Sequence, residues 1–218
     1  MRIKYLNIDD EAVVTLRQRD PKLNQLIKEI GNLEIELRTD YFASLVRSIV
    51  GQQISVTAAT TIYQRLKNLL KEKVSAESIL EKSPEQLREV GLTKRKVEYV
   101  KDLSDKVLTK QININQLDDY SDQEVIETLM KVKGIGQWTA EMFLILTLGR
   151  DDVLAIGDVG IQRAARWLYD VDKSKRREIL IEKSPLWQPY RSVVSFYLWE
   201  AIHLDLVTDE KIKTISYK

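Results

Sequence analysis

Hydrophobic residues recur every three or four positions along most of this 218-residue chain, which is the spacing of helices that bury one face. The segment 41–50 shows the pattern, because its apolar residues Phe42, Leu45, Val46, Ile49 and Val50 fall on one side of a helix. The spacing predicts helices over residues 21–30, 41–50, 56–70, 84–90, 94–108, 121–132, 137–148, 159–169, 175–183 and 190–206.

Signals at the ends of these segments agree with the periodicity. Asp20 and Pro21 suit the cap and first turn of a helix that stops at Gly31, and Ser121 with Glu124 forms a capping box. Residues 31–38 alternate instead, and with 151–156 they predict short strands or extended connectors. We therefore expect an all-α fold of two helical lobes with the functional cleft between them. Residues 40–157 would form one lobe, and residues 1–39 with 158–218 the other.

The amino-acid composition limits which metal, redox and binding sites the protein can contain. The chain has no cysteine, which excludes disulfides, thiolate zinc sites and an iron–sulfur cluster, and its single histidine, His203, excludes a multi-histidine metal centre. The 34 basic and 33 acidic residues nearly balance, which argues against a protein that coats nucleic acid. They still permit a local basic patch that binds it. No segment resembles a membrane span or a signal peptide. We expect an intracellular protein: cytoplasmic and nucleoid-associated in a prokaryote, nuclear in a eukaryote.

The most informative motif is the turn Lys133-Gly134-Ile135-Gly136 between two predicted helices. Glycines permit left-handed backbone and close approach of a ligand, and the N-terminus of the following helix presents N–H groups that suit an anion. Lys131 adds positive charge nearby. The alternative is an ordinary helical hairpin in which a glycine only ends the first helix.

This hairpin, from Val132 to Ala140, together with Asp158, resembles the helix-hairpin-helix and Gly/Pro–Asp (HhH-GPD) signature of base-excision DNA glycosylases. The segments 45–55 and 189–192, the latter leading to Trp199, resemble the AlkA-type 3-methyladenine DNA glycosylase II branch. The resemblance extends from about residue 20 to 206. Lys133 stands where Pro is common, and the length suggests that the N-terminal β-domain of some AlkA-type enzymes is absent.

The resemblance implies a monofunctional glycosylase that removes alkylated purines from duplex DNA by base flipping. Asp158 would be catalytic, stabilising a cationic sugar and orienting water. Asp158 also suits a helix cap, and the two roles are compatible. Bifunctional members carry a Lys at the position of Trp138, so Trp138 implies base removal without strand cleavage.

The remaining site residues follow from the same resemblance. The base pocket would comprise Trp138, Trp199, Tyr190 and Met142, although both tryptophans also suit helix packing. DNA would be contacted by Gln53, as the side chain inserted into the duplex, and by Lys133, Gly134, Ile135, Gly136, Gln137 and Thr139. From sequence alone, a surface residue near a helix cap is the favoured interpretation of Gln53.

We expect no redox cofactor or catalytic metal. The backbone carbonyls of Met130, Val132 and Ile135 would hold a structural Na⁺ or K⁺ at the hairpin, as in relatives. The partner would be double-stranded DNA containing damaged bases, bound by a monomer.

Three alternatives remain open. The first is a bifunctional glycosylase and lyase for oxidised bases, against which Trp138 argues. The second is a helix-hairpin-helix module that binds DNA without catalysis, which the presence of both Asp158 and Trp199 disfavours. The third is an unrelated helical scaffold.

Overall fold

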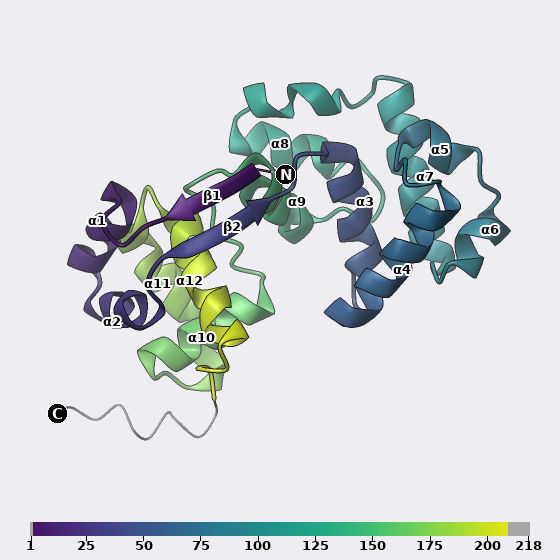
Figure 1. Cartoon of the computed structure of the whole chain (residues 1–218). Helices are drawn as coiled ribbons and strands as arrows, with labels where there is room; N and C mark the ends of the chain where they lie inside the picture. Colours follow the sequence, from purple (N-terminus) through teal and green to yellow (C-terminus); the bar gives the residue numbers. More distant parts are fainter. Residues whose placement is uncertain (1, 209–218) are drawn as a thin grey trace. The chain divides into compact units, whose positions relative to one another are not determined.

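The computed structural model describes residues 2–208, and these fold almost entirely as helices, with one pair of strands (Figure 1). The all-α prediction is confirmed. The chain divides into two compact units. We call residues 38–148 the hairpin unit, and the described residues of 1–37 and 149–218 the Asp158 unit.

The hairpin unit consists of short helices, most of which begin at a Ser or Thr whose side chain accepts a bond from the first turn. In chain order they are α3 (Tyr41–Gly51), α4 (Val56–Leu69), α5 (Ala76–Leu80), α6 (Pro84–Glu89), α7 (Lys94–Leu108), the 3₁₀ helix η1 (Ile114–Asp119), α8 (Asp122–Leu129), α9 (Gln137–Phe143) and the π-helix η2 (Leu144–Leu148). The sequence pattern predicted these helices except α5 and η1, which are too short to show a full helical repeat, and it predicted α9 and η2 as a single helix over residues 137–148.

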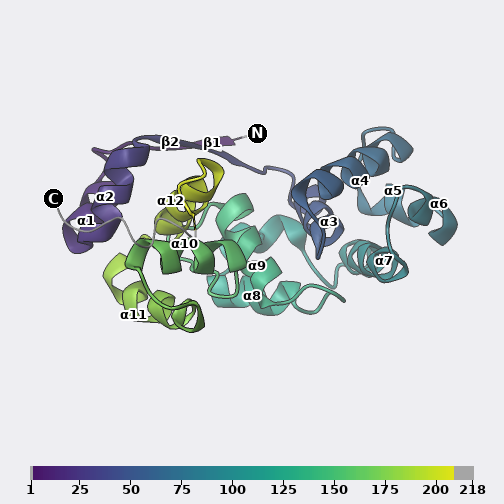
Figure 2. The same cartoon turned by 90° about the horizontal axis from the view of Figure 1, so that it is seen from below.

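The Asp158 unit surrounds its core with helices and one two-stranded sheet. Its elements are β1 (Arg2–Leu6), α1 (Glu11–Arg19), α2 (Pro21–Ile30), β2 (Leu33–Leu37), α10 (Val159–Tyr169), the 3₁₀ helix η3 (Lys173–Lys175), α11 (Glu178–Trp187) and α12 (Arg191–His203). The strands pair antiparallel, with Arg2 opposite Leu37 and Leu6 opposite Leu33. Helix α10 packs on α12 (Figure 2).

The structure resolves several of the sequence interpretations here. The strand predicted within 31–38 is confirmed as β2, whereas β1 and α1 were not predicted. Residues 151–156 form no strand, so of the two alternatives that the sequence left open they are a connector. They are held instead by α12, because Ser192 donates its backbone N–H to the Asp151 carbonyl at 2.9 Å and Arg191 pairs with Asp152 at 2.7 Å. The chain consequently changes unit after Leu148 rather than near 157.

A buried carboxylate joins the helices of the Asp158 unit. Asp20 caps α2 by accepting the Leu23 N–H at 3.1 Å, and it also accepts from Trp187 Nε1 at 3.0 Å and from the Tyr169 hydroxyl. Burial, with Asp20 beside it, raises the pKa of Tyr169. Because the carboxylate is fully hydrogen-bonded, its burial is tolerated, and it ties α2 to α10 and α11. Within residues 2–208 no helix is both long enough and apolar enough to cross a bilayer.

Candidate functional site

Asp158 is the N-cap of α10. Its Oδ1 accepts the backbone N–H of Ile161 at 2.8 Å and the indole Nε1–H of Trp199 at 3.3 Å. The side chain is half-buried. The predicted capping role is therefore confirmed, and the same bonds fix the direction of the carboxylate.

Gly160 makes room for this pair. A Cβ at residue 160 would lie 3.1 Å from Oδ1 of Asp158 and 3.7 Å from Cδ1 of Trp199. On the same helix, Gln162 is buried and donates from Nε2 to the Ile156 carbonyl at 2.7 Å. This hydrogen bond fixes the segment that precedes Asp158 in the chain. Neither Gly160 nor Gln162 was singled out from the sequence, because their roles arise only when α10 packs against its neighbours.

Trp199 and Tyr190, both expected in the base pocket, lie at different ends of α12. Trp199 is half-buried beside Asp158, and its ring meets Phe196 edge-on at a centroid distance of 5.8 Å. Tyr190 is the residue before the first turn of α12. At a rise of about 1.5 Å per residue, the two positions are roughly 13 Å apart along the helix. The structure thus brings Trp199, but not Tyr190, to Asp158.

The two glycines of the hairpin have different environments. Gly134 has a φ of +81°, and a Cβ there would lie 2.1 Å from Cδ2 of Tyr99 on α7. Gly136, the N-cap of α9, has a φ of −101°, and a Cβ added to it would meet nothing within 4 Å. Gly134 is therefore required for packing, whereas Gly136 leaves open space at the start of α9.

The backbone N–H of the hairpin residue Lys133 is already hydrogen-bonded within the protein. The backbone N–H of Lys133 donates to Oδ2 of Asp102 at 2.9 Å, and Asp102 also pairs with Lys106 at 2.7 Å. Burial opposes ionisation of Asp102, but these hydrogen bonds outweigh it and hold the pKa of Asp102 below its ordinary value. The Lys133 N–H therefore faces α7, while the Lys133 side chain is exposed.

Ile135, Thr139 and Gln137 were expected to contact DNA, and the structure restricts how they can. Ile135 and Thr139 are each only 4% exposed, which leaves almost no surface of either residue for a DNA contact, although Thr139 lines the cavity described below. Gln137 donates from Nε2 to Oε1 of Glu141 at 2.9 Å, and burial raises the pKa of Glu141. The apolar character of Ile135 already favoured an inward side chain, but no pattern in the sequence indicated that Thr139 would be buried.

The loop after α3 presents Gln53 at its surface. Gln53 is exposed and has a φ of +58°, a conformation that is uncommon for residues other than glycine and often marks functional loops. Gln52 donates from Nε2 to the carbonyl of Gly134 at 2.8 Å, so this loop is tied to the hairpin. The buried Lys96 donates to the Val50 carbonyl at 2.7 Å at the end of α3. Gln52 and Lys96 were not predicted as site residues.

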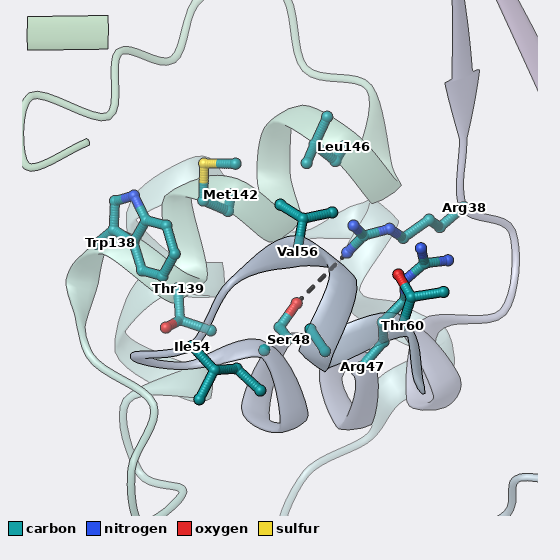
Figure 3. A pocket seen from close by; sticks show the side chains of 12 residues that line it. Arg38, Arg47, Ser48, Ile54, Val56, Thr60, Trp138, Thr139, Met142 and Leu146 are labelled. Atoms are coloured by element: carbon teal, nitrogen blue, oxygen red, sulfur yellow. Dashed lines mark hydrogen bonds between the residues drawn. The ribbon is translucent and has the colours of Figure 1, made fainter. Parts of the chain in front are cut away.

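A cavity of about 240 Å³ lies within the hairpin unit, walled by α3, α4, α9 and η2 (Figure 3). Trp138 and Met142, predicted for the base pocket, line it one turn apart on α9, as does Thr139. Arg38 and Arg47 also line it and were not predicted. Arg47 lies off the apolar stripe of α3, which is the one sequence signal that it faces something other than the core.

The family model for HhH-GPD superfamily base excision DNA repair proteins matches residues 46–189, which include the α3 loop, the hairpin and Asp158. The chain belongs to the HhH-GPD superfamily. Within this family it is 36% identical to a DNA-3-methyladenine glycosylase of Saccharomyces cerevisiae, with 90% of this chain and 82% of the yeast protein aligned.

Solved structures of the HhH-GPD superfamily share the fold. A DNA-3-methyladenine glycosidase of Bacillus halodurans superposes with a TM-score of 0.82 at 39% identity, covering 91% of this chain and 92% of that one. A 3-methyladenine DNA glycosylase of Schizosaccharomyces pombe, in complex with abasic DNA, gives a TM-score of 0.81 at 28% identity and covers 92% and 100%.

Proposed function

We propose that this protein is a monofunctional DNA glycosylase that hydrolyses the N-glycosidic bond of alkylated purines in duplex DNA, acting as a monomer. The observation that carries the proposal is Asp158, which is held by Ile161 N–H and Trp199 Nε1 inside the segment that matches the HhH-GPD family. The names of the similar glycosylases supply the substrate class.

Asp158 would act at the sugar. An alkylated purine is a good leaving group because it carries positive charge, so loss of the base leaves an oxocarbenium-like sugar. A fixed carboxylate stabilises that cation and orients the water that adds to it. The bonds from Ile161 and Trp199 both reach Oδ1, so they hold the carboxylate in one direction before substrate arrives.

The hairpin unit would hold the DNA. Lys133, Gly136 and Gln137 are exposed, and no side chain caps the start of α9, which suits contact with a phosphate. Gln53 would enter the gap left by the flipped nucleotide. Trp138, which has no amine, forms no Schiff base with the sugar, so we propose no lyase step.

A monovalent cation at the hairpin belongs to the same proposal. The carbonyls of Met130, Val132 and Ile135 would be its ligands. The Val132 carbonyl accepts the Ile135 N–H at 3.1 Å, which leaves a second lone pair, and Met130 is exposed at the end of α8. Such carbonyl oxygens suit Na⁺ or K⁺. The ion would add positive charge where phosphate approaches.

Base release from methylated duplex DNA tests the function. We expect release of 3-methyladenine or 7-methylguanine, resolved by chromatography, with the DNA strand left intact until alkali is added. Trapping of a covalent adduct by borohydride would contradict the monofunctional mechanism. Duplex binding without release of any base would instead indicate a DNA-binding module.

Trp199→Phe should slow excision about fivefold under single-turnover conditions. Phenylalanine keeps an aromatic face but cannot donate to Asp158, and a net hydrogen bond contributes about 1 kcal/mol. Affinity for undamaged duplex should not change. Trp199→Ala removes the stacking surface as well, so it should also reduce the preference for damaged duplex, by roughly 1–3 kcal/mol. If Trp199→Phe excises the base at the wild-type rate, the bond to Asp158 plays no part, and if Phe and Ala cause equal losses, the stacking surface plays none.

A further inference from the structure

One end of the cavity in the hairpin unit is cationic. Arg38 follows β2 in the chain and donates from Nη1 to Oγ of Ser48 at 3.5 Å, and Arg47 lies over the ring of Tyr63 at 5.7 Å from its centroid. Both arginines and Ser48 line the cavity with Thr60, and Figure 3 shows them grouped away from Trp138 and Met142. We call Arg38, Arg47, Ser48 and Thr60 the arginine end.

No carboxylate lines this cavity, and within residues 2–208 neither Arg38 nor Arg47 forms a salt bridge. The acidic side chains that influence Tyr63 are engaged elsewhere: Asp40 caps α3 by accepting the Ala43 N–H at 2.9 Å, and Glu72 pairs with Lys67. Two like charges therefore face a shared space without a counter-charge.

The energetics favour an anion at this position. Burial, and after it the charge of Arg47, lowers the pKa of Arg38. Arg38 is half-buried and has lost part of its hydration, while stacking on Tyr63 restricts Arg47. Guanidinium groups held in this way need little reordering to bond an anion, and their paired N–H groups match the oxygens of a phosphate.

We propose that the arginine end binds a phosphate group of the DNA strand, as an anion site separate from the hairpin. The remainder of the cavity supports this assignment, because Trp138, Met142 and Leu146 provide an apolar wall against which the sugar or base of the same nucleotide can lie. The proposal rests on the proposed function only in taking DNA as the source of the phosphate.

The salt dependence of DNA binding tests the site. Each phosphate contact contributes about 0.9 to the slope of log K against log salt concentration. For undamaged duplex, Arg38→Gln and Arg47→Gln should each reduce the magnitude of the slope, and the double variant, which loses the one phosphate contact entirely, should reduce it by about 1. Arg65→Gln is the matched control, since Arg65 is exposed on α4 but does not line the cavity. It should change the slope by much less.

Two further measurements serve as controls. The melting temperature of each variant should match that of the wild type, which shows that the variant is folded. Arg47→Lys keeps the charge but loses the planar guanidinium group, so it should retain the slope while weakening binding. If Arg65→Gln lowers the slope as much as Arg47→Gln, the effect is one of general charge and the proposal fails.

A second arm separates DNA from free anions. Inorganic phosphate should raise the melting temperature of the wild type above that in chloride at equal ionic strength, and it should do so less for the double variant. If phosphate stabilises the wild type but DNA slopes are unchanged, a free anion rather than the DNA strand is the ligand, which overturns the proposal. Because undamaged duplex is used, absence of base release would refute the proposed function without affecting this result.

Discussion

Asp158→Asn is expected to lower the single-turnover rate of base excision by about two orders of magnitude. The substitution removes the negative charge that would face the cationic sugar, which is worth about 3 kcal/mol for a preorganised electrostatic group. The fold should survive, because the amide oxygen of Asn can still accept from Ile161 N–H and Trp199 Nε1, as Oδ1 does now. Affinity for undamaged duplex should not fall.

The measurement requires a lesion with a stable glycosidic bond, such as hypoxanthine, because 7-methylguanine is lost spontaneously and hides part of the effect. Asp170→Asn provides a control of identical chemistry at the other end of α10. Asp170 is an exposed C-cap with a φ of 54°, a conformation that Asn tolerates well. Equal loss of activity in both variants, or near wild-type excision by Asp158→Asn, would remove Asp158 from the catalytic centre.

Gly134→Ala should destabilise the hairpin unit by about 3 kcal/mol. The added methyl group would fall 2.1 Å from the Tyr99 ring, and the φ of +81° is unfavourable for alanine. Overpacking typically costs about 1–3 kcal/mol and a left-handed residue about 1–2 kcal/mol. Thermal or urea unfolding measures the loss, and we expect duplex binding to decline with the folded fraction.

Gly136→Ala is the companion variant, because its methyl group meets nothing within 4 Å and its φ of −101° is ordinary. It should unfold like the wild type yet bind every duplex more weakly, since the methyl group occupies space that a phosphate would approach. Wild-type DNA affinity in folded Gly136→Ala would leave the hairpin as a connector. Wild-type stability in Gly134→Ala would show that Tyr99 moves aside at no cost.

From the sequence alone, the two glycines are equivalent. The structure separates them, because a Cβ at Gly134 would meet the Tyr99 ring and one at Gly136 would meet nothing within 4 Å. A Gly-x-Gly motif shows that the backbone turns, but it does not show which glycine a distant ring approaches. Tyr99 lies on α7, far from the hairpin in sequence, so only tertiary packing distinguishes a glycine needed for stability from one whose open space is available to a ligand.

Local signals determined most of the helices and the position of Asp158. These signals are the spacing of apolar residues, the Ser and Thr caps, and the N-cap at Asp158. Each depends on residues three or four positions apart, so it can be predicted from the sequence. Strand β1 was missed because its pairing partner, β2, lies beyond two helices. The burial of Thr139, which was predicted to contact DNA, likewise could not be read from the sequence, because it depends on what packs against α9.

The sequence, by its motifs, determined the family of this protein, the carboxylate at Asp158 and the hairpin. Tertiary structure alone decided which groups those motifs meet: Trp199 donates to Asp158, Gln52 ties its loop to Gly134, and Arg38 and Arg47 share a cavity with Trp138. The physical reason is that such contacts join helices distant in the chain, so their geometry depends on how whole elements pack and not on the spacing of residues within one of them.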